Sequence, residues 1–338
     1  MKVRVVALFS GSLASVLAAK IVMQSPQVEE VKLLHFRSPF FRYFNETKAL
    51  AGALWLPALH SQSVKSHFRE LSNINGSYRL RDCCMGCRSL MLSKGLRYMR
   101  RLDADFLVTG EIVGTRGLGS EDLRWISEQA GDPGRILRPL SARLLSQTLP
   151  QQEGWVGLSQ LHALTADQPQ SLVALAQRMG INVTGYPAER RCKLTQTRFG
   201  QRLEDLLQEE SFSMNSLELL EFPHYFTTSP DVKIVVGCNE EEKRQLHNFF
   251  LPSDIRLYVP LYNAPMALVR SNWEDKPAHE IADIVELAGR IAATYSHLSK
   301  RINHRVQVHY RFENAEETLR MRVAPFASSQ EMEQYCLK

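Results

Sequence analysis

The chain has few cysteines and no long hydrophobic run. Six cysteines in 338 residues are too sparse for a disulfide scaffold, which excludes the small, disulfide-rich secreted class. No apolar run reaches the roughly 18 residues that a membrane helix needs. The segment 10–12 (Ser-Gly-Ser) interrupts the N-terminal apolar stretch that could imitate a secretory signal. Internal repeats and low-complexity tracts are also lacking. We therefore expect a cytoplasmic globular protein that makes no membrane contact.

The charge is only mildly unbalanced, at a formal +5 with a pI of about 8.9. This balance permits a polyanionic partner without requiring one.

The length indicates two or three domains. We expect boundaries that give segments 1–145, 146–221 and 222–338.

Strand-like and helix-like segments alternate over residues 1–145. The expected strands are 3–9, 31–36, 59–64 and 104–111, and the expected helices are 13–23, 48–54 and 88–101. This alternation predicts an α/β fold with a doubly wound, mostly parallel sheet covered by helices on both faces. Ligands of such folds bind at the carboxyl ends of the strands. Residues 146–221 are helical and loop-rich, and 222–338 form an α+β unit with a long helix from residue 278.

The stretch "ALFSGSLASVLAAK" (7–20) has the layout of a phosphate-binding strand, turn and helix. Such a turn presents unpaired backbone N–H groups and the positive end of a helix dipole. Ser10, Ser12 and Ser15 add hydroxyl donors. A purely steric use of serine and glycine in a strand–helix turn is the alternative.

The stretch "RDCCMGCRSLML" places Cys84 and Cys87 in C-x-x-C spacing just before the expected helix 88–101. This spacing lets two sulfurs converge on one centre. It is compatible with a metal or cluster site, a redox dithiol, or buried thiols.

The N-terminal turn resembles the PP-loop motif S-G-G-x-D-S of ATP-dependent tRNA-modifying enzymes. Ser10, Gly11 and Ser15 match it, whereas Ser12 replaces the second glycine and Ala14 replaces the aspartate. Ala14 lacks a carboxylate of the kind that holds Mg²⁺ beside a triphosphate, and no acidic residue occurs between positions 1 and 28. The resemblance implies that ATP and Mg²⁺ bind at a set of residues in two loops. These residues are Ser10, Gly11, Ser12, Ser15, Gly110 and Glu111.

Longer segments resemble the tRNA thiouridylase-like branch of the PP-loop superfamily. They are "ADFLVTGEIVGTR", "ILRPLSARLLSQTLPQQEGWV" and "YPAERRCKLTQTRFGQRL". In thiolating members three cysteines hold a [4Fe–4S] cluster, and the resemblance carries this role to Cys84, Cys87 and Cys192. Three thiolates leave one iron without a protein ligand. A zinc site is the alternative, with His35 or His162 as fourth ligand.

This branch has a basic stretch where residues 165–171 read "TADQPQS", and Gly-Gly where Arg190 and Arg191 stand. The phosphate and RNA surfaces of this chain therefore differ from those of the branch, while the three cysteines match.

The C-terminal segment resembles the RNA-binding module of NFACT proteins. The matching residues are Gly237, Asn239, Asp254, Pro265, Arg270, Tyr295 and Ser296. Cys238 and Lys243 replace an arginine and an asparagine of that module. We expect RNA contacts from Arg190, Arg191, Arg270, Lys300, Arg301 and Arg305, and base stacking on Tyr258, Tyr262 or Tyr295. The alternatives are basic residues that favour a helix C-terminus and tyrosines that pack in the core.

Together these features predict a tRNA-modifying sulfur transferase that makes thiouridine from an adenylated uridine with the help of a [4Fe–4S] cluster. Its partners would be tRNA or another RNA, and a sulfur donor protein or inorganic sulfide. The first alternative is a non-catalytic, RNA-binding iron–sulfur protein with a degenerate PP-loop. The second is an ATP-independent thiouridine desulfurase.

Overall fold

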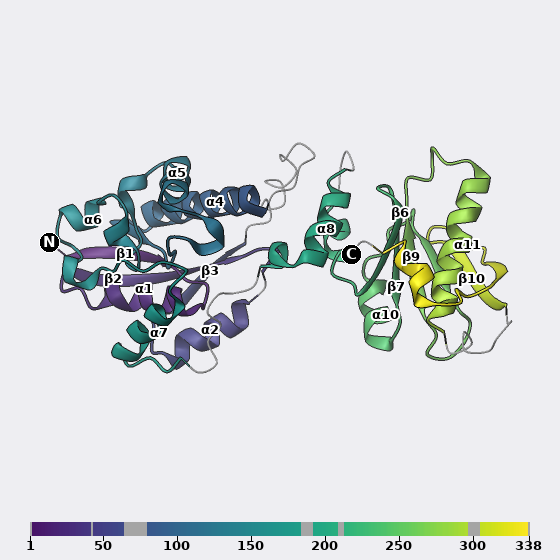
Figure 1. Ribbon diagram of the computed structural model, residues 1–338, viewed down its shortest axis with the longest axis horizontal. Coiled ribbons are helices and arrows are strands. Elements are labelled where there is room, and N and C mark those ends of the chain that lie inside the picture. Colours follow the sequence, from purple (N-terminus) through teal and green to yellow (C-terminus); the bar gives the residue numbers. More distant parts are fainter. Residues whose placement is uncertain are drawn as a thin grey trace. The chain divides into compact units, whose positions relative to one another are not determined.

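The computed structural model describes residues 2–41, 43–63, 80–183, 192–208, 213–296 and 305–336. The chain divides into two compact units, residues 1–195 and 196–338 (Figure 1). The segment predicted at 146–221 is divided between them, because its first helices pack into the core of the N-terminal unit. Within the described residues, no helix combines the length and the apolar character needed to cross a membrane.

The N-terminal unit is built around a parallel sheet. Its strands are β1 (Val3–Leu8), β2 (Val28–Arg37), β3 (Leu59–Ser63), β4 (Phe106–Val108) and β5 (Ile136–Leu137). Their order is β3-β2-β1-β4-β5, and every pair is parallel. Apart from Arg4, strand β1 (VRVVAL) is apolar, as expected for a parallel strand with both faces covered. The predicted doubly wound α/β fold is confirmed.

Helices cover both faces of this sheet. They are α1 (Leu13–Met23), α2 (Phe44–Ala53), α4 (Leu80–Arg101), α5 (Ser120–Ala130), α6 (Leu149–Gln152) and α7 (Pro169–Arg178). Helices α1, α2 and α7 share one apolar core with β1 and β4. Helices α4 and α5 form the other core, where Leu96 and Ile126 are fully buried.

Helix α4 is longer than the sequence pattern predicts. It begins at Leu80 rather than at residue 88, so Cys84 and Cys87 lie within it and not before it. The correction matters because side chains three residues apart in a helix lie on the same face. A helix alone therefore sets the relative position of these two thiols.

The C-terminal unit is a six-stranded antiparallel sheet with helices. Its helices are α8 (Thr197–Leu206), α9 (Met214–Leu219), α10 (Glu240–His247), α11 (Ala278–Thr294) and α12 (Ser329–Glu333). Its strands are β6 (His224–Ser229), β7 (Val232–Gly237), β8 (Ile255–Tyr258), β9 (Met266–Arg270), β10 (Val306–Phe312) and β11 (Leu319–Val323). The order is β11-β10-β8-β9-β7-β6. Helix α11 packs on the sheet through Ile284, Val285, Ala288 and Ile291, the apolar face that the sequence predicts.

Candidate functional site

A cavity of about 420 Å³ lies in the N-terminal unit, where the strand order reverses between β1 and β4. It is lined by the residues that follow both strands, by one face of α4, and by Cys192. In doubly wound sheets such a switch point at the strand ends is the usual place for a ligand. The sequence-predicted residues that line it are Ser10, Ser12, Ser15, Cys84, Cys87, Gly110, Glu111 and Cys192. Gly11 lies in the same turn but outside this lining.

The turn after β1 is shaped by its own hydrogen bonds. Gly11 has a φ of +78°, which glycine adopts without steric cost. Ser12 caps α1, and its Oγ accepts a hydrogen bond from the Ser15 backbone N–H at 3.3 Å. The Ser10 hydroxyl donates to Ser12 Oγ at 3.0 Å. The hydroxyls predicted to bind phosphate thus also hold the turn in shape, and the positive end of α1 begins at the cavity wall.

Gly110 is required by the close approach of two backbones. A Cβ at this position would lie 2.6 Å from the Ser15 backbone nitrogen and 2.7 Å from the carbonyl carbon of Ala14. The loop after β4 therefore packs directly on the first turn of α1. This packing brings Glu111 and the serine turn to the same cavity.

Three thiols line the cavity together. Cys84 and Cys192 are buried and Cys87 is half-buried, and all three are free thiols. Burial raises the pKa of the Cys87 thiol well above its usual value, and the nearby Cys192 and Cys84 raise it further. Burial also raises the pKa of Cys192. The thiolates of Cys87 and Cys192 are thus unfavourable without a compensating positive charge.

Arg116 supplies part of that charge. It has a left-handed backbone (φ 57°, ψ 34°), and its Nη1 lies 3.7 Å from the Cys84 sulfur as a hydrogen-bond donor. It also lowers the pKa of both Cys192 and Cys87 against the effect of burial. A left-handed backbone is uncommon for a residue other than glycine, and such residues are often found at functional sites.

Glu111 is neutralised by two arginines. Its Oε1 accepts from Arg88 on α4 at 3.0 Å, and its Oε2 accepts from Arg138 at 2.9 Å. Although burial opposes ionisation, Arg138 and then Arg88 hold the pKa of Glu111 below its usual value. Among the described residues that line the cavity, Glu111 is the one with a carboxylate. This carboxylate is committed to an ion-pair network.

The two histidines considered as zinc ligands differ in position. His35 is buried and lines the cavity, with its Nδ1 2.9 Å from the Phe9 carbonyl oxygen. His162 lies outside the cavity lining. The "TADQPQS" segment contributes Thr165, Ala166 and Pro169 to the wall, so this part of the lining brings no positive charge.

Two of the six predicted RNA-contacting residues, Arg270 and Arg305, lie among the described residues. Arg270 is held by its own unit, because Nε and Nη2 bind Asp254 at 2.8 and 2.6 Å and Nη2 also binds the Phe249 carbonyl oxygen. Arg305 is exposed. The remaining four lie outside the described residues: Arg190, Arg191, Lys300 and Arg301.

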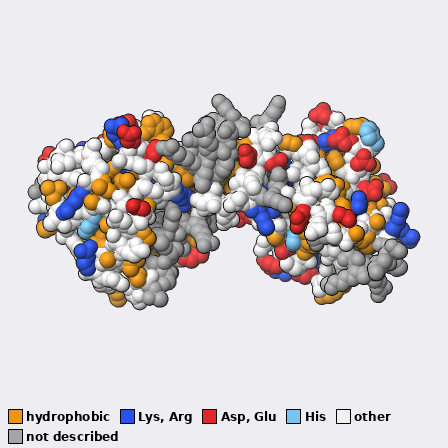
Figure 2. Space-filling view, in the orientation of Figure 1, with side chains coloured by type: hydrophobic (Ala, Val, Ile, Leu, Met, Phe, Trp, Pro, Cys, Tyr) orange, Lys and Arg blue, Asp and Glu red, His pale blue; other side chains and the backbone are white. Residues whose placement is uncertain are grey.

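The three tyrosines also differ. Tyr262 is 92% exposed at the turn between β8 and β9. Tyr258 packs edge-on against His309, and Tyr295 packs on His224. On the face shown in Figure 2, Lys and Arg side chains of the C-terminal unit are interspersed with Asp and Glu. Tyr262 is thus the best placed of the three to stack on a base.

Sequence reasoning missed three arginines of the cavity region: Arg88, Arg116 and Arg138. Arg88 directly follows Cys87, and Arg116 ends the segment "ADFLVTGEIVGTR" that carries the family resemblance. The position of Arg88 beside a cysteine, and that of Arg116 at the end of a matched segment, are the sequence features that could have identified them. Their pairing with Glu111 and Cys84 depends on tertiary contacts that no local pattern encodes.

Residues 224–336 match the family model described as NFACT protein RNA binding domain, which confirms the predicted C-terminal resemblance. No curated protein sequence matches the chain. Similar solved structures include the C-terminal part of the fibronectin/fibrinogen-binding protein of Streptococcus suis, with 13% identity over 49% of this chain and 73% of that chain (TM-score 0.27). The U34-tRNA thiolase NcsA of Methanococcus maripaludis with its [4Fe–4S] cluster is 12% identical over 65% and 72% of the two chains (TM-score 0.34). NMN synthetase of Francisella tularensis is 12% identical over 65% and 83% (TM-score 0.33). At these values, function has to be inferred from the chemistry of the cavity.

Proposed function

We propose that this protein is a sulfur transferase that acts on tRNA. The observation that carries the proposal is the cavity itself. One space of about 420 Å³ is lined both by the serine turn at the start of α1 and by Cys84, Cys87 and Cys192. An anion-binding helix terminus and a set of soft ligands therefore face the same substrate volume.

The three thiols suit an iron–sulfur cluster better than a single ion. All thiolates on one zinc ion bind it at about 2.3 Å, which limits the distance between two sulfurs to about 4.6 Å. Among the described residues, the set of three ligand side chains whose ligand atoms all lie within 4.8 Å of one another is in the C-terminal unit. The sulfurs of Cys84, Cys87 and Cys192 therefore do not lie close enough together for one zinc ion. Thiolates on separate irons of one cluster are spaced more widely. When bound by three protein thiolates, a [4Fe–4S] cluster supplies one iron that has no protein ligand.

The protein's own residues have three tasks in this proposal. The helix terminus at Ser12 binds a phosphate or another anionic group of the substrate. Arg116 donates a hydrogen bond to the Cys84 sulfur, and it stabilises the thiolate form of Cys192 by hydrogen bonding and charge. Apolar residues of the wall, such as Phe9 and Leu34, exclude water from the sulfur chemistry.

The C-terminal unit supplies RNA binding in this proposal. The match of residues 224–336 to an RNA-binding family supports this role, and among the predicted RNA-contacting side chains that the structure describes, Tyr262 and Arg305 are exposed. Tyr262 would stack on an unpaired base, and Arg305 would meet a phosphate.

Iron and sulfide content tests the ligand set. We expect anaerobically purified wild-type protein to contain about four irons per chain, and Cys192→Ala to lose most of them. Cys83→Ala is the matched control, because Cys83 is buried on the same helix but does not line the cavity. An iron-free wild type that carries zinc would contradict the cluster.

Analysis of tRNA tests the reaction. Thiolated nucleosides would be compared between a strain that lacks the protein, its parent, and the deletion strain complemented with Cys192→Ala or Cys83→Ala. We expect one thiolated nucleoside to disappear in the deletion strain and to return only with Cys83→Ala. An unchanged nucleoside profile would argue strongly against a sulfur transferase.

A second candidate is a non-catalytic descendant that keeps the thiols and the RNA-binding unit but not ATP. It is favoured by Ala14, which lines the cavity where the motif has a carboxylate, and by the commitment of Glu111 to two arginines. Calorimetric titration with ATP and Mg²⁺ separates the two candidates. Micromolar binding by the wild type supports the transferase. Binding that occurs only in Ala14→Asp supports the descendant.

A further inference from the structure

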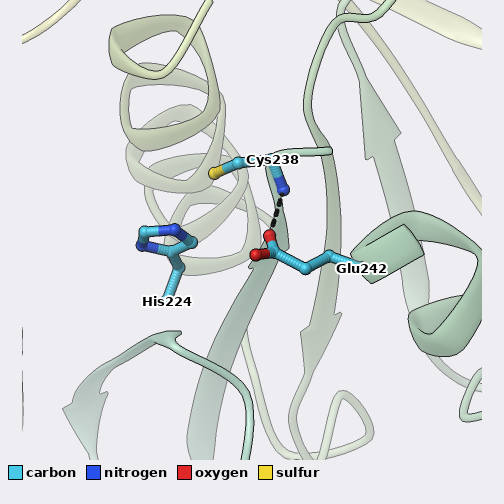
Figure 3. Close-up of side chains that lie close together, drawn as sticks. All are labelled: His224, Cys238 and Glu242. Carbon is cyan, nitrogen blue, oxygen red and sulfur yellow. Dashed lines mark hydrogen bonds between the residues drawn. The ribbon is translucent and has the colours of Figure 1, made fainter. Parts of the chain in front are cut away.

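Three side chains with different ligand atoms converge in the C-terminal unit. His224 begins β6, Cys238 directly follows β7, and Glu242 lies in the first turn of α10. One ligand atom from each lies within 4.8 Å of those of the other two, and all three side chains are half-buried. Figure 3 shows the imidazole, the sulfur and the carboxylate around one common space.

Backbone contacts hold two of these groups in place. The Oε2 of Glu242 accepts a hydrogen bond from the Cys238 backbone N–H at 2.8 Å. Asn239 caps α10, and its side chain accepts from the Glu242 backbone N–H at 2.9 Å. A Cβ on Gly237 would lie 3.0 Å from the Lys243 backbone nitrogen, so β7 and α10 are in close contact here. The thiol and the carboxylate are therefore positioned by the fold before any ligand arrives.

We propose that His224, Cys238 and Glu242 form a zinc-binding site. Imidazole nitrogen, thiolate sulfur and carboxylate oxygen are the three ligand types that Zn²⁺ uses in proteins. One thiolate and one carboxylate balance the +2 charge of the ion, and a neutral imidazole adds no charge. Three protein ligands leave one tetrahedral position for water or an external ligand.

The site is a property of this chain and not of its family resemblance. Cys238 stands where the NFACT module has an arginine, so the sulfur ligand arises at a position that the module fills with a cation. The imidazole of His224 also packs on Tyr295, with ring centroids 4.5 Å apart, which fixes the ring. A metal here would fasten β6 and the β7–α10 junction to each other.

Cobalt and zinc titration of the full-length protein tests the site. Cys84, Cys87 and Cys192 are first replaced by serine, so that the thiols of the proposed cluster cannot bind the added metal. The outcome then does not depend on whether the cluster proposal is correct. We expect this reference protein to bind one equivalent of Co²⁺, with a thiolate-to-cobalt absorption band in the near ultraviolet. The Cys238→Ser change should abolish the band, whereas Cys336→Ser, in the same core, should leave it unchanged.

Zinc affinity, measured by competition with a chelator, assigns the other two ligands. His224→Ala and Glu242→Gln should each weaken zinc binding by at least about 100-fold, more than the loss typical when a residue that only supports a metal ligand is changed. The Gln variant keeps an oxygen that can accept a hydrogen bond from the Cys238 backbone N–H. Any loss of zinc affinity in this variant therefore reports the effect of the carboxylate charge. Equal zinc binding by the reference protein and by its Cys238→Ser variant would overturn the proposal.

A second measurement applies if the triple-serine protein does not fold. The zinc content of the wild type and of Cys238→Ser, both purified in the presence of zinc, should differ by one equivalent. Zinc should also raise the unfolding temperature of the wild type but not of the variant. The same zinc content and the same shift in both proteins would contradict the site.

Discussion

Glu111 joins three segments of the N-terminal unit through its charge. It follows β4, while its partners come from α4 and from the segment after β5. Arg138 is 5% exposed, and its Nη1 also donates to Ser127 Oγ on α5 at 2.8 Å. Removing one member of such a buried network leaves an uncompensated charge, which costs far more than a surface ion pair contributes.

We therefore expect Glu111→Gln to lower the free energy of unfolding by about 3 kcal/mol. The folded-state pKa of Glu111 is below its usual value of 4.5. Its stabilising effect is thus fully present above pH 4.5 and is lost as the pH falls through the folded-state pKa. Urea midpoints of the wild type and the variant, measured from pH 7 to pH 3, should move closer together as the pH falls below 4.5. A constant difference over this range would show that Glu111 acts through packing and not through charge.

Gly110 is a second position where a small change to one side chain should alter the local structure. Gly110→Ala places a Cβ 2.6 Å from the Ser15 nitrogen and must push the loop away from α1, which we expect to destabilise the unit by about 2 kcal/mol. Gly52→Ala is the control, because its Cβ meets nothing within 4 Å in α2. We expect that change to be neutral or stabilising by up to about 1 kcal/mol. Chemical denaturation measures both, and equal effects would contradict the close contact.

Most secondary-structure elements of the cavity unit are predictable because their cause is local. The apolar run of β1 and the Ser-Gly-Ser turn before α1 specify a strand, a turn and a helix within 23 residues. The start of α4 is not predictable in this way, since "RDCCMGC" has no helical periodicity of apolar residues before residue 88. Its cysteines enter the helix because Cys84 packs in the core shared with Leu92 and Leu96.

The residues of the candidate site also differ in whether local sequence predicts them. The three cysteines and the serine turn are found from sequence spacing and resemblance. The arginines are not, because their partners are distant in sequence: Arg116 is 32 residues from Cys84, and Arg138 is 27 residues from Glu111. The metal-ligand set in the C-terminal unit was missed although Cys238 was noted as a replacement. Its histidine comes from another strand, and only the sheet pairing of β6 and β7 brings them together.

Arg202 is one of the buried residues that attach helix α8 to the C-terminal unit. Arg202 is 3% exposed, and its Nη1 donates to the Leu220 and Phe222 carbonyl oxygens at 2.8 and 2.6 Å. Its guanidinium also lies 4.8 Å from the centre of the Tyr225 ring. Burial lowers the pKa of Arg202 to about 10, so it remains charged at neutral pH.

Truncation of the Arg202 side chain should weaken the attachment of α8 to the C-terminal unit. We expect Arg202→Ala to destabilise the C-terminal unit by about 3 kcal/mol, because two buried carbonyl groups lose a charged donor. Arg198→Ala, an exposed change on the same helix, should alter stability by less than about 0.5 kcal/mol. Urea denaturation followed by circular dichroism gives both values. Similar effects of the two changes would show that the Arg202 contacts contribute little.

The molecule as a whole combines two units whose interiors are built differently. The N-terminal unit buries both faces of a parallel sheet, and its cavity opens where strand order reverses. The C-terminal unit covers an antiparallel sheet with α11 and has its own core around Ile291 and Val308. The proposed sulfur-transfer site and the proposed RNA-binding site lie in different units and can thus be altered separately, which makes the two proposals testable one at a time.

Because each unit has its own core, we expect two unfolding transitions in scanning calorimetry. Gly110→Ala should lower the temperature of one transition, and Arg202→Ala should lower that of the other. For a domain of 150–200 residues, 2–3 kcal/mol corresponds to a shift of about 4–12 °C. Added zinc should raise only the transition that Arg202→Ala lowers, since the proposed metal ligands lie in that unit. A single transition that both variants shift equally would mean that the two cores unfold as one cooperative structure.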